Sequence, residues 1–239
     1  MIPEGIRAVF FDAVGTLIHP DPPAAEVYAT VGRRHGSRLG PSVIATRFRT
    51  AFRRQEEHDL AAGLRTSEAR EVERWRQIVG EVLDDTADPE ACFQELFDHF
   101  SRPEAWHCDP EAAAVLRQLA DRGLELGLAS NYDARLRRVA AGLPALRPVR
   151  HLIISAEVGW RKPAPQFFAA LCQEVGLPAD QVLFLGDDWV NDYQGARAAG
   201  LTAILLERGH PAHTISLEPG HHVVRIRRLS ELVGDPPPS

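Results

Sequence analysis

Seven polar residues have the chemical types needed to bind a phosphate group and a hard divalent cation: Asp12, Ser130, Asn131, Lys162, Asp187, Asp188 and Asp192. Taken singly, each is explained as a turn residue, a helix cap or a surface charge. Taken together, they offer the carboxylates that Mg²⁺ prefers, with substrate phosphate and water completing its octahedron. A carboxylate also attacks phosphorus to give an aspartyl phosphate, once nearby positive charge offsets the repulsion between the two anions.

Lys162 is the only lysine among 27 basic residues, so the other 26 are arginines. A GC-rich genome, in which arginine codons are favoured at surface positions, explains the excess of arginine over lysine. Chance alone also explains why one lysine remains. A third explanation is functional. An ammonium is a compact point charge that approaches a carboxylate and a phosphate together, whereas a guanidinium is bulkier and fixed in its fork geometry.

Short apolar runs precede most of these polar residues. The run Ile6–Phe11 ends at Asp12, Leu124–Ala129 precedes Ser130, and Gln181–Leu185 precedes the acidic pair. Such runs predict buried strands that break into turns. Lys162 lies just before a predicted helix, 164–175, that prolines open.

Strands and helices alternate over the C-terminal half of the chain. Further strands are predicted at His151–Ile154, Ala203–Leu206 and His222–Ile226, with helices at 110–121, from Asp133, at Trp189–Ala199 and near the C-terminus. Alternation of this kind predicts an α/β fold with a Rossmann-like, doubly wound parallel sheet. Ligands of such sheets bind at the carboxyl ends of the strands, where the polar residues lie.

The stretch between the first strand and the rest of the sheet has a different, helical pattern. Apolar residues recur at helical spacing from Pro20 to Pro103, which predicts four amphipathic helices and no strand. We therefore predict a core formed by residues 1–18 and 104–239, and a helical cap formed by residues 19–103. Trp75 and the cap phenylalanines are interpreted as the interior of this bundle rather than as a surface for substrate.

Four stretches in this order and spacing resemble the haloacid dehalogenase superfamily, in the subfamily (IA) with a helical cap after the first strand: F-F-D-A-V-G-T-L at 10–17, L-A-S-N-Y-D at 128–133, G-W-R-K-P-A-P-Q-F-F at 159–168 and F-L-G-D-D-W-V-N-D-Y-Q-G-A-R-A-A-G at 184–200. The last two look most like the branch named after haloacid dehalogenase-like hydrolase domain-containing protein 3. The fold implied by this resemblance covers nearly the whole chain.

The resemblance implies a role for each candidate residue. Asp12 is expected to be the nucleophile and a metal ligand, and Ser130 to bind a phosphoryl oxygen with help from the Asn131 backbone. Lys162 is expected to hold Asp12 and the substrate. Asp187 is expected to bind Mg²⁺ directly and Asp192 to orient metal waters or Lys162, which leaves Asp188 as an outer neighbour or a helix cap.

Val14 departs from the family pattern, in which phosphatases carry a second Asp two residues after the nucleophile. Its carbonyl is a candidate metal ligand, but its side chain cannot transfer a proton. A positioned acid or base contributes about 10²- to 10⁴-fold to a rate. We predict a Mg²⁺-dependent phosphatase that acts on a small phosphorylated metabolite and is weakened by this change.

Two further functions remain open. One is a non-catalytic or regulatory binding protein that retains the fold, which the change at Val14 favours. The other is a metal-independent 2-haloacid dehalogenase, which the acidic cluster disfavours because it would repel a carboxylate substrate. A relative that forms a Schiff base on a cap lysine is excluded, because the predicted cap contains no lysine.

Composition narrows the remaining classes. The net charge of -6 over 239 residues argues against nucleic-acid binding, and no apolar run reaches the ~20 residues of a membrane span. Three separated cysteines and an N-terminus without signal-peptide features lead us to expect a cytoplasmic protein. His210, His213, His221 and His222 lack a fixed ligand spacing, so they predict a solvated loop rather than a metal site.

Overall fold

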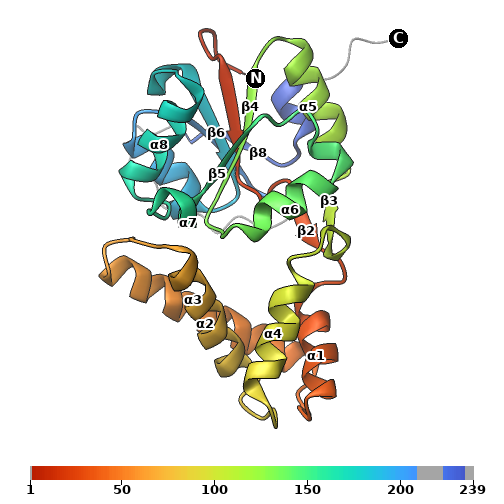
Figure 1. Cartoon of the computed structure of the whole chain (residues 1–239). Helices are drawn as coiled ribbons and strands as arrows, with labels where there is room; N and C mark the ends of the chain where they lie inside the picture. The colour runs from red at the N-terminus through yellow and green to blue at the C-terminus, as the bar shows by residue number, and fades with distance from the viewer. Residues whose placement is uncertain (1, 209–222, 235–239) are drawn as a thin grey trace.

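A six-stranded sheet forms the centre of the larger lobe in the computed structural model, which describes residues 2–208 and 223–234 (Figure 1). The strands follow the order β5-β4-β1-β6-β7-β8, and every neighbouring pair is parallel. Their bounds are β1 (Ala8–Phe11), β4 (Glu125–Ser130), β5 (His151–Ile154), β6 (Val182–Gly186), β7 (Thr202–Leu206) and β8 (Arg225–Ile226). The predicted α/β fold with a Rossmann-like parallel sheet is confirmed.

Both faces of this sheet are buried, which explains why its strands read as continuous apolar runs. Side chains alternate along β1, so Phe10 and Phe11 enter two different hydrophobic clusters and neither is exposed. The cluster of Phe11 includes side chains of α5 (Ala112–Asp121), α6 (Arg135–Gly142) and α10 (Ser230–Val233). The cluster of Phe10 includes side chains of α8 (Pro165–Val175) and α9 (Gly195–Ala198).

Residues 24–99 form a separate lobe of four α-helices, as the apolar periodicity predicts (Figure 1). The helices are α1 (Ala24–Arg34), α2 (Pro41–Ala61), α3 (Glu68–Val82) and α4 (Pro89–His99). The side chains of Ser67 and Asp88 cap α3 and α4 by accepting hydrogen bonds from backbone N–H groups of their first turns. Aliphatic residues such as Ile44 and Ile78 fill the interior of this bundle.

A short antiparallel pair joins the two lobes. β2 (Ile18–Pro20) leaves the core and β3 (Trp106–Cys108) returns to it, with Ile18 opposite Cys108. The sequence did not predict these strands, because three residues are too few to show an alternating pattern. Short 3₁₀ turns occur at Pro103–Ala105, Pro144–Leu146 and Ala179–Gln181, and a single helical turn, α7 (Ser155–Val158), follows β5.

The segment after β6 differs from the continuous α-helix predicted over Trp189–Ala199. Residues Trp189–Gln194 form a π-helical segment, in which the N–H of Tyr193 donates to the carbonyl of Asp188 five residues earlier (3.1 Å), and α9 follows it. The wider turn accompanies a close approach of Asp192 to β6. A Cβ at Gly186 would lie 2.2 Å from Oδ2 of Asp192, so only glycine leaves room for it.

Two predictions from the C-terminal region fall wholly or partly outside the described residues. His210, His213, His221 and His222 all lie there, as does the Pro-Pro-Pro-Ser end, whereas the predicted strand His222–Ile226 is represented by β8. Among the described helices, none combines the length and the apolar character needed to cross a membrane.

Candidate active site

The order of the central strands brings the candidate residues to one edge of the sheet. Phe11, the last residue of β1, pairs with Leu128 of β4 on one side and with Leu185 of β6 on the other. Asp12 and Asp187 follow β1 and β6, and Ser130 ends β4. Since the strands are parallel, their carboxyl ends meet at this edge, where the chain also changes its direction of winding.

Asp12 lies at the centre of a hydrogen-bonded group. Its Oδ1 accepts from the hydroxyl of Ser130 (3.0 Å) and from Nζ of Lys162 (2.6 Å). The same ammonium donates to Oδ1 of Asp192 (2.6 Å) and to the carbonyl of Ala129 (3.2 Å). One positive charge therefore bridges two carboxylates, and within the described residues nothing donates to Oδ2 of Asp12.

Asn131 fixes Lys162 through its side chain, and the expected help of its backbone in binding a phosphoryl oxygen stays a prediction. Its Oδ1 accepts from the backbone N–H of Lys162 (2.7 Å), and its Nδ2 donates to the carbonyl of the same residue (3.0 Å). This reciprocal pair joins the end of β4 to the loop before α8. It holds the start of the lysine side chain while the two carboxylates hold its end.

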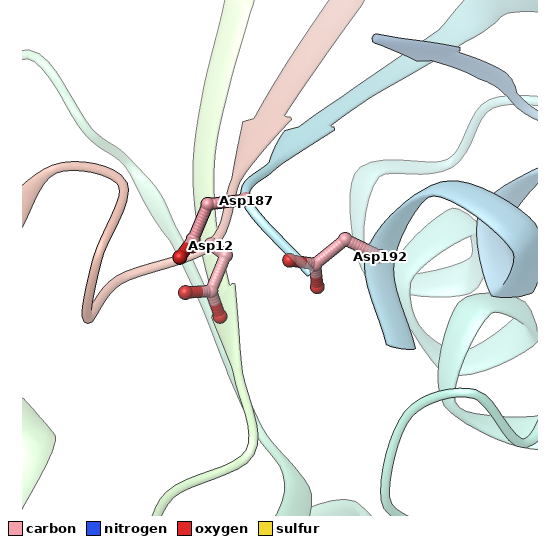
Figure 2. A group of neighbouring side chains, drawn as sticks. All are labelled: Asp12, Asp187 and Asp192. Atoms are coloured by element: carbon pink, nitrogen blue, oxygen red, sulfur yellow. The ribbon is translucent and has the colours of Figure 1, made fainter. Parts of the chain in front are cut away.

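Asp12, Asp187 and Asp192 offer carboxylate oxygens that lie within 4.8 Å of one another (Figure 2). The hydroxyl of Thr16 orients Asp187 by donating to its Oδ1 (2.8 Å). Gly15 makes room for Asp187, because a Cβ there would lie 2.4 Å from Oδ2. Acidic oxygens gathered in this way suit a divalent cation with hard oxygen ligands.

The two later aspartates have different partners. Asp188 caps the π-helical segment, since its Oδ1 accepts from the N–H groups of Val190 (2.8 Å) and Asn191 (2.7 Å). Asp192 has both oxygens engaged, Oδ1 by Lys162 and Oδ2 by the N–H of Asp188 (3.0 Å). Asp192 therefore holds Lys162, and Asp12 and Asp187 are the better placed carboxylates for a metal.

The pKa values of the Asp12, Asp187 and Asp192 carboxyl groups are all raised. Burial is the largest cause for each of them, and the neighbouring carboxylates add to it. The pKa of Asp192 rises to about 6, although the ammonium of Lys162 opposes the shift. Burial lowers the pKa of Lys162, but Asp12 and Asp192 outweigh it, so the net pKa is raised and the lysine stays charged.

A cavity of about 460 Å³ opens above this group, between the two lobes. Val14 lines it and is 37% exposed, so a side chain at this position faces the site but carries no ionisable group. Tyr132 lines the cavity, whereas Trp160 is absent from the lining and packs under Arg65. The metal-ligand role of the Val14 carbonyl stays a prediction.

The interpretation of the cap aromatics as bundle interior was incomplete. Phe48, Phe52, Trp75 and Phe100 pack against the cap core, but they also line the cavity. Helical periodicity identifies the apolar face of each helix without showing which part of that face meets another helix and which part meets a cavity.

Three further residues near the site were missed. Thr16 orients Asp187, as described above. Arg161 lines the cavity and pairs with Glu71 and Asp59 of the cap. Arg208 supports the loop after β1, because its guanidinium donates to the carbonyls of Gly15 (2.6 Å) and Thr16 (2.9 Å). Arg208 lies 192 residues from Thr16 along the chain, so no local sequence pattern points to this contact.

Comparisons with known proteins agree with this geometry. Residues 6–200 match the family described as haloacid dehalogenase-like hydrolase. Haloacid dehalogenase-like hydrolase domain-containing protein 3 of Homo sapiens is 30% identical over 210 residues, which cover 84% of this chain and 82% of that protein.

Two other similar proteins differ in the activity that their names state. A phosphoserine phosphatase of Thermus thermophilus is 32% identical over 137 residues, 56% of this chain and 54% of its own length. A solved structure of a dehalogenase aligns with a TM-score of 0.71 at 18% identity and covers 97% of both chains. The latter likeness establishes the fold alone.

Proposed function

The chain belongs to the haloacid dehalogenase-like hydrolase family, and from that premise we propose that it is a Mg²⁺-dependent phosphohydrolase acting on a small phosphorylated metabolite. The observation that carries the proposal is the charge of the site. Asp12, Asp187 and Asp192 present carboxylate oxygens within 4.8 Å of one another, and Lys162 is the cation that bridges two of them. A divalent cation offsets the negative charge that remains when all three are ionised.

The residues present fit Mg²⁺ as a ligand set. Asp12 and Asp187 would hold it, the carbonyl of Val14 is a further candidate, and Gly15 and Thr16 keep the carboxylate of Asp187 in place. Bound there, Mg²⁺ would neutralise charge on the transferring phosphoryl group and on the attacking carboxylate. Asp192 contributes indirectly, by holding Lys162.

Asp12 is the nucleophile in this proposal. Its Oδ1 is held by Ser130 and Lys162, which leaves Oδ2 to attack phosphorus while the bond from phosphorus to the ester oxygen breaks. The products of this step are an aspartyl phosphate and the free alcohol, whose oxygen takes up a proton from solvent water. Water then attacks the phosphoryl group and releases inorganic phosphate and Asp12. Ser130 and Lys162 hold the phosphoryl oxygens in both steps.

Val14 sets the rate that this site achieves. The loop after β1 offers no side chain that gives a proton to the leaving oxygen or takes one from the attacking water. Removing such a group costs about 10²- to 10⁴-fold. Hydrolysis is therefore slow for esters of weakly acidic alcohols and faster for leaving groups that depart as stable anions.

The test is phosphate release by the purified chain from a panel of aryl, acyl and alkyl phosphates. We expect turnover of aryl and acyl phosphates with Mg²⁺, loss of it in EDTA, and loss of it in Asp12→Asn. Asp180→Asn is a matched control, because Asp180 is exposed and lies on a turn away from the cavity. Beryllofluoride with Mg²⁺ should form an adduct at Asp12, which a crystal structure would show.

The same panel, extended by a 2-haloacid, distinguishes the competing functions. Halide release from a 2-haloacid in EDTA would establish the dehalogenase and contradict the role given to the metal. Absence of turnover in the wild type, together with activity gained by Val14→Asp, would establish a binding protein that has lost catalysis. Absence of both the adduct and turnover would refute the enzyme proposal.

A further inference from the structure

We propose that the substrate is a phosphate monoester that carries an aromatic ring, with the ring in the cavity between the lobes and the phosphate at Asp12. The inference rests on the proposed function, since it assigns the phosphate end to that cluster. The inference deepens the proposed function by naming the chemical class of the group that is esterified to the phosphate.

A continuous series of aromatic side chains lines the cap side of the cavity: Trp75, Phe52, Phe48, Tyr28, Phe100 and Trp106. Centroids of consecutive rings along this series are 5.5 to 6.4 Å apart. We call these six residues the aromatic wall.

The wall extends to the phosphate end of the site. The ring of Trp106 lies 6.3 Å from that of Tyr132, which follows Ser130 by two residues and also lines the cavity. A substrate whose phosphate is held by Ser130 and Lys162 therefore has its ester substituent beside this wall. The residues that bind the phosphate and the wall that contacts the substituent therefore lie next to each other.

The wall is not simply the interior of the bundle. Phe48, Phe52 and Trp75 are each partly exposed, whereas Tyr28 of the wall and Phe93 of the same bundle are both 2% exposed. Apolar ring surface that faces a water-accessible cavity is stabilised when an apolar group covers it. The structure thus provides the driving force for binding an apolar substituent.

The charged side chains that line the cavity beside the wall are engaged within the protein, which does not favour a sugar or polyol substituent. Glu56 of α2 accepts from Nδ2 of Asn191 (3.4 Å). Arg135 is engaged by both oxygens of Asp133 (2.7 Å each), and Arg161 is engaged by Glu71 and Asp59. Hydroxyl groups placed against the wall would lose their hydrogen bonds to water without gaining others.

An aromatic substituent suits the wall better than an aliphatic one of similar size. Rings in the wall already pack edge-to-face, tilted or stacked, for example Tyr28 against Phe48 at 87° and Phe48 against Phe52 at 18°. A substrate ring extends this pattern, and such ring pairs add about 0.5–1.5 kcal/mol beyond the area they bury. The cavity volume of about 460 Å³ lies in the lower part of the range for small-molecule sites, which favours a small aromatic ester.

The experiment compares kcat/KM with Mg²⁺ for benzyl, cyclohexylmethyl and propyl phosphate. All three release a primary alcohol of similar acidity, so the comparison isolates the substituent from the leaving group. We expect benzyl phosphate to exceed propyl phosphate about 30-fold, from the extra apolar area buried, and to exceed cyclohexylmethyl phosphate about 3- to 10-fold, from ring packing.

A pair of variants locates the effect. Phe48 touches Tyr28, Phe52 and Trp75 within the wall, so Phe48→Leu should lower the ratio of benzyl to propyl kcat/KM about 3- to 10-fold. Phe93→Leu removes a ring from the same bundle but not from the cavity lining. We expect it to lower thermal stability and to leave the ratio unchanged.

Binding of benzylphosphonate and propylphosphonate, measured by calorimetry with Mg²⁺, separates this inference from the proposed function. Equal kcat/KM for the three esters would overturn the aromatic class and leave the phosphatase standing. No hydrolysis of these esters or of the aryl and acyl phosphates, with benzylphosphonate bound about 30-fold tighter than propylphosphonate, would overturn the phosphatase and support the aromatic cavity. No hydrolysis and equal binding would overturn both.

Discussion

Replacing Lys162 by Met tests whether this residue holds the acidic cluster together by its charge. The side chain is 2% exposed, and its ammonium lies 2.6 Å from both Asp12 and Asp192. Met has a similar length and flexibility, so it fills the same space without creating a large cavity. The change therefore removes the charge and largely preserves the packing.

The expected loss of stability is substantial. Removing one partner of a buried ion pair costs about 3–5 kcal/mol, because the other charge stays buried without compensation. Here Lys162 serves two carboxylates at once. We expect the free energy of unfolding of Lys162→Met to be lower than that of the wild type by about 3–5 kcal/mol at pH 8.

The deficit should depend on pH with a definite sign. Burial raises the pKa of Asp12 and Asp192, and the ammonium of Lys162 lowers both, so its removal raises them further. The folded variant then binds protons at pH values where the unfolded chain, with aspartate pKa values near 3.8, binds none. Its stability therefore falls as the pH rises from about 4 to about 8, and the deficit is smallest at the acidic end.

Urea unfolding without Mg²⁺ at pH 5 and pH 8, followed by tryptophan fluorescence and circular dichroism, measures the loss of unfolding free energy and its change with pH. Arg197→Met, which removes an exposed cation of α9, is the control. Adding Asp192→Asn to Lys162→Met should cost less than the sum of the two single changes. An equal deficit at both pH values would show that packing, not charge, is what Lys162 contributes, and the electrostatic reasoning would be wrong.

Two other predictions concern the metal and the missing proton donor. Mg²⁺ at a hundred times its dissociation constant should raise the melting temperature of the wild type by about 5 °C. Asp187→Asn should lose most of this shift, and exposed Asp180→Asn should keep it. An equal shift in all three proteins would argue against Asp187 as a ligand. Val14→Asp should raise kcat/KM by about 10²-fold for benzyl phosphate and by less for phenyl phosphate; an equal gain on both substrates would contradict a role in protonating the leaving group.

The sequence predicted the edge of the sheet well because Asp12, Ser130 and Asp187 lie at the ends of short apolar runs. The runs before Asp12, Ser130 and Asp187 are strands in the structure, displaced by at most two residues at either end. Parallel pairing then brings their ends together without further information. The position of Lys162 did not follow from a strand, and only its motif and its uniqueness pointed to the site.

Contacts between distant residues and the shape of the cavity were not predictable in this way. The pair formed by Asn131 and Lys162 joins residues 31 apart, and it uses an amide that reads as an ordinary turn residue. The π-helical segment that carries Asp192 has the same apolar spacing as an α-helix. The aromatic wall needs the mutual placement of several helices and β3, which periodicity within one helix does not contain.

In the proposed phosphate hydrolysis, Lys162 acts on the attack at phosphorus and Val14 on the departure of the leaving group, and the aromatic wall bears on the second. Lys162 compensates the charge of Asp12 and the phosphate, so it favours attack on phosphorus whatever the leaving group. Because Val14 cannot donate a proton, an alkoxide leaving group departs slowly. A phenolate, whose parent acid has a pKa of about 10, needs that proton much less. An ester of a phenol satisfies both features of this chain, since its ring covers the wall and its oxygen departs without an acid. The kcat/KM of the wild type should therefore be higher for phenyl phosphate than for benzyl phosphate, and Val14→Asp should reduce that difference.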